Sequence, residues 1–164
     1  MLMEVMIAND HSVYAGSVTG FIHKINGDAA SATAKFEGAK ILDLTASSDA
    51  LFALTLRKEI HELDANSLEV RRMVTMPFNA TCMTYVSGTS ELWVGDSAGK
   101  IHVLAADSLE QTHELEGNNQ ALKQMITSPD SSMVVSGNKT RHIIVWSTTS
   151  KEKLQENGNH KQGI

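Results

Sequence analysis

Short apolar runs alternate with turn-forming residues along the whole chain. In the clearest case, the apolar runs Leu92–Val94 and Ile101–Leu104 enclose the polar, glycine-containing stretch Asp96–Gly99. This pattern predicts a β-hairpin, because glycine takes a positive φ in a tight turn at no steric cost. No segment of useful length has helical periodicity, so we expect an all-β chain.

This hairpin occurs four times, at intervals of 38 to 42 residues. The second strand opens each time with an isoleucine: Ile22, Ile60, Ile101 and Ile143. Six positions earlier, at the end of the first strand, stand Gly16, Leu54, Gly95 and Gly137. A repeat of about 40 residues that holds four strands is the period of a β-propeller blade.

The other two strands of each unit flank its hairpin. Inner strands are predicted at Glu4–Ile7, Ile41–Leu44, Thr81–Tyr85 and Leu122–Ile126. Outer strands, more polar because they meet solvent, are predicted at Thr33–Phe36, Leu68–Arg71, Leu109–His113 and Lys151–Leu154. Residues 29–34 are expected to form a loop, and Cys82, Trp93 and Trp146 to be buried. No linker divides the chain, so we predict one array over residues 1–164, with approximate units 1–36, 37–76, 77–117 and 118–164.

The fourth unit resembles a WD repeat. Ser128-Pro129-Asp130 leads into an apolar strand and Gly137, and a strand ending in Trp146 follows. Asp64 stands in the second unit where the family has an Asp after its Trp, and residues 158–160 are similar to its Gly-His element. The resemblance implies a β-propeller of WD-repeat type that serves as a scaffold for protein–protein interaction.

The resemblance also bears on completeness, because a WD-repeat ring usually has seven blades and four are present here. The sequence stops at Ile164, where a fifth inner strand would begin. An open array leaves an apolar face at each end, and large exposed apolar patches usually mark an interface. We therefore expect an incomplete propeller, which the remaining blades of a longer protein or another chain would close.

One departure from the family concerns polar contacts. WD repeats often place an Asp three residues before the aligned isoleucine, where it bonds a His and fixes the blade. The residues at that position are Thr19, Arg57, Ala98 and Thr140. We therefore expect these blades to be held by apolar packing, without that polar contact.

A finer resemblance points to a partner. The order of degenerate units, and residues 91–117 followed by the Ser-Pro-Asp unit, are similar to WD-repeat proteins of the actin cytoskeleton. That similarity would imply binding to actin filaments decorated with cofilin and promotion of their disassembly.

Composition limits location and partners. A net charge of −5 does not favour binding to nucleic acid. The single cysteine, Cys82, excludes an internal disulfide and fits a reducing compartment. No apolar run approaches the length of a membrane span, and the N-terminus is not a signal peptide. We expect a cytoplasmic protein, associated with the cytoskeleton if the resemblance to actin-binding proteins holds.

Charged turns supply the candidate partner-binding residues. Alternate turns of a meander lie at one end of the sheet, so the four hairpin turns are expected to share a basic rim of Arg57, Lys58, Lys100, Lys139 and Arg141. The opposite rim is expected to hold Asp10, Asp28, Asp49, Asp64, Asp107 and Asp130. The basic rim would bind an acidic protein such as actin, and the alternative is solvated charge with no binding role.

No catalytic, cofactor or metal site is predicted, and therefore no enzyme. His23, His61 and His102 hold equivalent positions, but on third strands, too far from the propeller axis to share an ion. They are expected to be polar side chains near blade interfaces. An enzyme with a central pocket would need converging groups on the inner strands, which offer Glu4 and Asp43. A structural subunit that completes a propeller in a larger assembly is a further alternative.

Overall fold

The computed structural model describes residues 2–7, 12–117 and 119–157, and for residues 2–7 it describes the backbone. Within these ranges the chain is all-β, without helix, and forms four separate antiparallel sheets of four strands each. This confirms the predicted blade architecture. The chain divides into two compact units, residues 1–77 and 78–164, and each unit contains two sheets.

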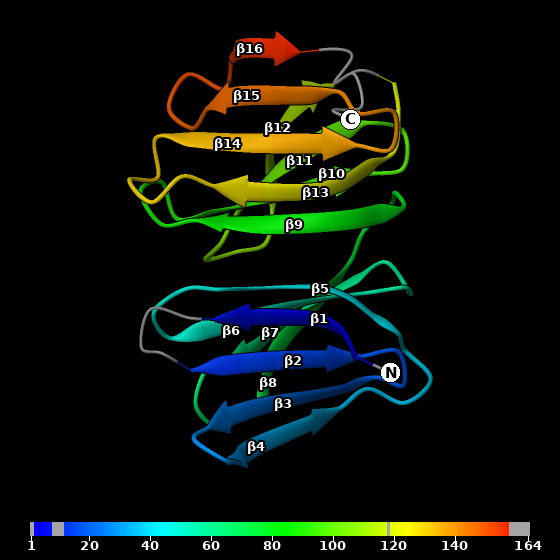
Figure 1. Ribbon diagram of the computed structural model, residues 1–164, viewed down its shortest axis with the longest axis vertical. Coiled ribbons are helices and arrows are strands. Elements are labelled where there is room, and N and C mark those ends of the chain that lie inside the picture. The colour runs from blue at the N-terminus through cyan, green and yellow to red at the C-terminus, as the bar shows by residue number, and fades with distance from the viewer. Residues whose placement is uncertain (1, 8–11, 118, 158–164) are drawn as a thin grey trace, which may run out of the picture. The chain divides into compact units, whose positions relative to one another are not determined.

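In unit 1, the strands of each sheet follow one another in chain order (Figure 1). The first sheet contains β1 (Leu2–Ile7), β2 (Val13–Ser17), β3 (Phe21–Asn26) and β4 (Ala29–Lys35). The second contains β5 (Ile41–Ala46), β6 (Ala50–Thr55), β7 (Glu59–Asp64) and β8 (Val70–Thr75). The inner strand β5 lies against β1 and β2, so the two sheets stack face to face.

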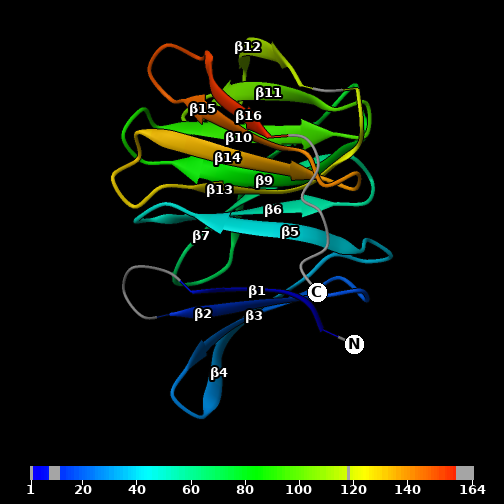
Figure 2. The same cartoon turned by 45° about the horizontal axis from the view of Figure 1, so that its top comes forward.

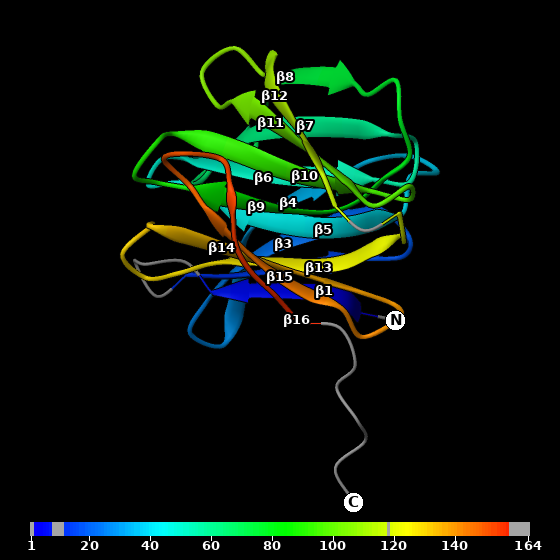
Figure 3. The ribbon, with the colours of Figure 1, turned by 90° about the horizontal axis from the view of Figure 1, so that it is seen from above.

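Unit 2 repeats this arrangement. Its first sheet contains β9 (Ala80–Val86), β10 (Glu91–Asp96), β11 (Lys100–Ala105) and β12 (Gln111–Glu116). Its second contains β13 (Leu122–Thr127), β14 (Met133–Asn138), β15 (Ile143–Ser147) and β16 (Lys153–Asn157). The inner strands β9 and β13 lie side by side (Figure 2), and β16 is the last strand of its sheet (Figure 3).

The outer strands begin later than predicted in three of the four sheets. Leu68 and Leu109 are not in strands: they have φ of 59° and 58°, and their N–H groups bond to the carbonyl oxygens of Asp64 and Ala105, four residues earlier. Lys151 repeats this turn, with φ of 62°. The two leucine side chains are buried, so the apolar residue that suggested a strand belongs to the turn before it. Residues 29–34, predicted as a loop, lie in β4.

Each unit has its own apolar core between its two sheets. In unit 1 the core is built from Tyr14, Ile22, Ile41, Leu44, Leu51 and Leu63. In unit 2 it is built from Trp93, Ile101, Val103, Leu122, Met125 and Trp146. The prediction that Cys82 and both tryptophans are buried is confirmed, since each is at most 2% exposed. Burial of these side chains is the main source of stability in such a stack.

Glycine marks the closest approach between sheets within each unit. A Cβ atom on Gly16 would lie 2.7 Å from Cγ2 of Ile41, and one on Gly95 would lie 2.8 Å from Cδ1 of Leu122. Ile41 and Leu122 are the first residues of inner strands β5 and β13. The aliphatic side chain that opens one sheet therefore fills the space left by a glycine on the sheet before it. Gly137 holds the equivalent position in β14, and among the described residues none beyond its chain neighbours has an atom within 4 Å of such a Cβ.

Candidate functional site

The hairpin turns of unit 1 lie at one end of their two sheets, as predicted for a meander. The connection between the sheets joins them, because the N–H of Phe36 donates to Gly20 O and the N–H of Leu56 donates to Lys40 O, both at 2.9 Å. Gly20 takes φ of 85°, and a Cβ there would lie 2.5 Å from Ala39 O, so glycine is required. We call residues 18–20, 36–40 and 56–58 the hairpin rim of unit 1.

The β6–β7 turn forms the tip of this rim. Leu56 is 63% exposed, which is unusual for a leucine, and the predicted partner-binding residues Arg57 and Lys58 beside it are exposed as well. Lys58 has φ of 65°, and its N–H donates to Thr55 O at 3.1 Å, which fixes the turn. Within the described residues neither cation has an ion pair. The tip thus presents an apolar side chain beside two positive charges that remain available to a partner.

In unit 2, the predicted cations differ in their surroundings. Lys139 and Arg141 are exposed in the β14–β15 turn and have no ion pair in the described part of the chain. Lys100 is held by two carboxylates, with its Nζ 2.6 Å from Glu114 Oε1 and 2.9 Å from Glu116 Oε1. These hydrogen bonds raise the pKa of Lys100, and the bond from Lys100 lowers that of Glu114. The charge of Lys100 is therefore already balanced within its sheet.

The prediction that no Asp–His contact holds a blade is wrong for the sheet β9–β12. Asp96 and His102 are both buried, and His102 Nε2 lies 3.0 Å from Asp96 Oδ2. The other carboxylate oxygen accepts hydrogen bonds from the N–H groups of Ala98 and Lys100, both at 2.9 Å. The ring of Phe78 stacks on His102 with 3.6 Å between centroids. One carboxylate thus ties the hairpin turn to the third strand.

This contact was not predicted from the sequence, because Asp96 stands five residues before the aligned isoleucine and not three. The residue that caps each hairpin turn comes five positions before the aligned isoleucine, directly after the strand-ending position: Ser17, Thr55, Asp96 and Asn138. Asn138 Oδ1 accepts from the N–H groups of Thr140 and His142, at 2.9 and 3.0 Å. The sequence therefore did indicate the turn contacts, because all four repeats have a small polar residue at this position. Such residues favour turns by bonding nearby backbone N–H groups.

The three aligned histidines are structural side chains. His61 and His102 are buried and His23 is half-buried, in agreement with the expectation of polar residues near sheet interfaces. His61 Nε2 lies 3.1 Å from Glu59 Oε2, and His23 Nδ1 lies 2.9 Å from Thr33 Oγ1. Among residues 2–7, 12–117 and 119–157, no three His, Cys, Asp or Glu side chains gather in a way that could hold a metal ion. The described residues also include no helix long and apolar enough to cross a membrane.

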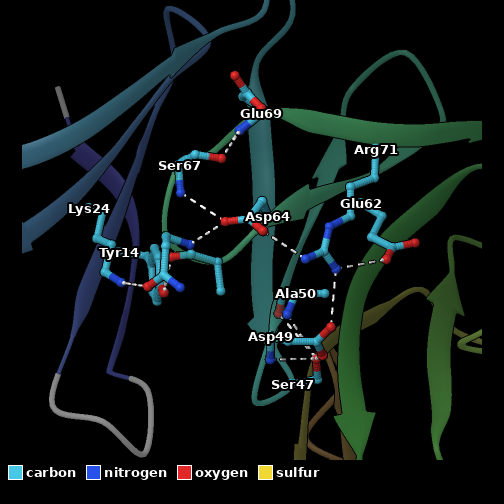
Figure 4. Close-up of polar contacts among 12 residues, drawn as sticks. Tyr14, Lys24, Ser47, Asp49, Ala50, Glu62, Asp64, Ser67, Glu69 and Arg71 are labelled. Carbon is cyan, nitrogen blue, oxygen red and sulfur yellow. Dashed lines mark hydrogen bonds and ion pairs between the residues drawn. The ribbon is translucent and has the colours of Figure 1, made fainter.

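The opposite rim of unit 1 is less acidic than predicted, because a cation that the sequence analysis did not assign to it lies among the aspartates (Figure 4). Arg71 Nη2 lies 2.7 Å from Asp64 Oδ2, and Arg71 Nη1 lies 3.2 Å from Asp49 Oδ2. Asp64 also accepts hydrogen bonds from the N–H groups of Ser67 and Asn66, and these bonds, with Arg71, lower its pKa. Arg71 therefore offsets part of the negative charge of this surface. Asp10 lies outside the described residues.

The same rim carries contacts that join the two sheets of unit 1 (Figure 4). The hydroxyl of Tyr14 donates to Ala65 O at 2.8 Å, and Lys24 Nζ donates to Asn66 Oδ1 at 2.9 Å. Both acceptors lie in the β7–β8 turn, and both donors come from the first sheet. These polar bonds hold the β7–β8 turn against the first sheet.

Comparison with known proteins gives a match in sequence and a match in structure. No established family profile matches the chain. Actin-interacting protein 1-2 from Arabidopsis thaliana is 29% identical over 86 residues, which are 51% of this chain and 14% of that protein. A chain in the crystal structure of the mitotic checkpoint complex superimposes with a TM-score of 0.82, at 16% identity, over 98% of this chain and 52% of that chain.

These matches agree with the resemblance predicted from the repeat. The structural match establishes the fold, because its coverage of this chain is nearly complete although the sequence identity is low. The sequence match is weak, and this chain corresponds to a small part of the Arabidopsis protein. The chain has the four-stranded blades of a WD-repeat β-propeller, and its sequence has weak homology to actin-interacting protein 1.

Proposed function

We propose that the chain is a scaffold for protein–protein interaction that binds actin filaments decorated with cofilin through the hairpin rim of unit 1. The observation that carries the proposal is the exposed Leu56 beside Arg57 and Lys58. An apolar side chain next to charges without ion pairs suits an interface whose centre excludes water and whose edge is polar. The acidic surface of actin complements these charges, and the similarity to actin-interacting protein 1-2 supports actin as the partner.

The hairpin turn of the last sheet contributes a second basic element in this proposal. Lys139 and Arg141 are exposed there and would add attraction for the same acidic partner. Lys100 has a different role, because its carboxylate partners leave less charge for binding. A protein with this partner would work in the cytoplasm, at the actin cytoskeleton.

Co-sedimentation with actin filaments, with and without cofilin, tests the proposal. The chain should pellet with cofilin-decorated filaments, and Arg57→Glu with Lys58→Glu should weaken binding about ten-fold, because each reversed charge now repels the partner. Leu56→Ser should weaken it by a smaller factor. Thr149→Glu and Ser150→Glu add negative charge to exposed residues of the β15–β16 turn and should leave binding unchanged. Failure of the unsubstituted chain to pellet under both conditions would remove actin as the partner.

A further inference from the structure

One face of the sheet β13–β16 is apolar and uncovered. Ile126 is 56% exposed and Met133 is 37% exposed, and Val135, Ile143 and Val145 on the same face are half-buried. In the preceding sheet the residues equivalent to these last three are Trp93, Ile101 and Val103, and each is completely buried in the core of unit 2. The face therefore carries the apolar residues of a face that packs against another sheet, but no sheet in the described part of the chain covers it.

Gly137 lies on this face near the end of β14, opposite Ile143, the first residue of β15. Its equivalents Gly16 and Gly95 receive the aliphatic side chains of Ile41 and Leu122, whereas in the described part of the chain no residue beyond its chain neighbours comes within 4 Å of a Cβ position on Gly137. The face thus has an empty recess of the kind that receives the first residue of another inner strand.

The sheet β1–β4 presents the complementary feature at the other end of the repeat. Val13 and Ile25 are half-buried, although the equivalent residues of the next sheet, Leu51 and Leu63, are completely buried. Leu2 opens β1 and pairs with Ser17, and an irregularity between Leu2 and Glu4 follows.

In its own sheet, Leu2 holds the same backbone position as Ile41 and Leu122, the two residues that fill the glycine recesses within the units. Ile41 pairs with Thr55 and Leu122 with Asn138, and each is followed by the same irregularity before the next pair. Leu2 is therefore the equivalent of Ile41 and Leu122, in a sheet that follows no other sheet of this chain.

We propose that the open face of β13–β16 binds the sheet β1–β4 of a second copy of this chain, with Leu2 of that copy at Gly137. The contact repeats the one that already joins sheets within each unit, so it needs no new packing geometry. It joins two different surfaces, and such a head-to-tail contact gives a closed ring where the rotation closes and a longer chain of copies where it does not.

The native mass of the 164-residue chain, measured by sedimentation over a range of concentrations, tests this contact. The mass should rise to at least twice the 17.8 kDa of one chain. Ile126→Asp places a charge in the contact and should return the chain to the mass of one copy. Leu56→Asp, which changes an equally exposed residue of the hairpin rim, should leave the association intact. A mass of one copy at every concentration for the unsubstituted chain would overturn the proposal, and further blades of a longer protein would then be the occupant to consider.

Complementation separates the proposed contact from any other association and from misfolding. Gly137→Trp fills the recess on one face, and Leu2→Asp disables the other face, so each variant alone should have the mass of one copy. Mixed together, each variant still has one intact face, and these faces should join in a one-to-one complex. If either variant alone still associates, or if the mixture stays at the mass of one copy at every concentration, the assigned faces are wrong.

Discussion

The two sheets of unit 2 carry the same repeat but have different surroundings. In β9–β12, Trp93 and Gly95 face the neighbouring sheet and are completely covered. In β13–β16, Val135 and Gly137 hold the same positions, yet Val135 is half-buried and no other sheet of the described chain covers Gly137. The difference teaches that the burial of a residue in a blade depends on the neighbouring sheet as much as on the strand itself.

Replacement of the large apolar residue at this position should give the largest contrast. Trp93→Ala should lower the free energy of unfolding by about 3–5 kcal/mol, because it leaves a cavity in the core. Val135→Ala should cost less than about 1.5 kcal/mol, because the side chain is partly exposed and its neighbours can adjust. Urea unfolding at low protein concentration measures both. Equal costs would mean that the two faces are packed alike.

Adding a methyl group to the glycines should give the next largest contrast. Gly95→Ala should cost about 1–3 kcal/mol, since its Cβ would lie 2.8 Å from Leu122 Cδ1 and 2.9 Å from Cys82 Sγ. Gly137→Ala should change the free energy of unfolding by less than about 0.5 kcal/mol, because it meets no neighbour. Thermal unfolding of the two variants compares them, and a large loss at Gly137 would contradict the open face.

Removal of the residue that caps each hairpin turn should give a smaller difference in the free energy of unfolding between the two sheets. Asp96→Ala should cost about 1–2 kcal/mol, because it leaves a buried histidine and two backbone N–H groups without their acceptor. Asn138→Ala should cost about 1 kcal/mol or less, because the N–H groups that it caps lie in an exposed turn and can bond to water. Equilibrium unfolding in urea would show whether the buried contact is the stronger one.

The smallest expected difference between the two sheets is in how their stability changes at low pH. In the β13–β14 turn, hydrogen bonds from the Ser128 hydroxyl and from Ser132 lower the pKa of Asp130 from 3.8 to about 2. A lowered pKa in the folded state stabilises the chain above pH 4, and this contribution disappears as the pH falls from about 4 to about 2. Asp130→Asn should remove that part of the pH dependence, measured as melting temperature against pH. The β9–β10 turn, residues 87–90, has no carboxylate and should show no such step. A variant that follows the parent's pH profile would contradict the assignment.

The repeat made the fold predictable because its strongest signals are local. Alternating apolar runs and glycine-containing turns predict the four sheets and the order of their strands. The place of Gly95 at the end of a strand, just before the turn, can likewise be read from the sequence. The outer strands were misplaced because a buried leucine in a turn, such as Leu109, looks like a strand residue. Its positive φ depends on the turn and not on the side chain.

The candidate site was predictable only in part, because contacts across a sheet are not visible in sequence order. The exposure of Arg57 and Lys58 follows from their place in a turn. The pairing of Lys100 depends on Glu114 and Glu116 on the neighbouring strand, and the neutralising role of Arg71 depends on two separate turns. The exposure of Leu56 was not predicted, because a large apolar side chain is ordinarily expected to be buried.

The central claim is that the two sheets within each unit stack through an aliphatic residue that fills the space above a glycine. A double-mutant cycle of Gly95→Ala and Leu122→Ala tests it most directly by urea unfolding. Leu122→Ala alone should cost about 2–5 kcal/mol, and the new methyl group at position 95 should occupy part of the space it leaves. The double variant should therefore be at least about 1 kcal/mol more stable than the sum of the single losses predicts. Losses that add to within about 0.5 kcal/mol would contradict contact between these residues.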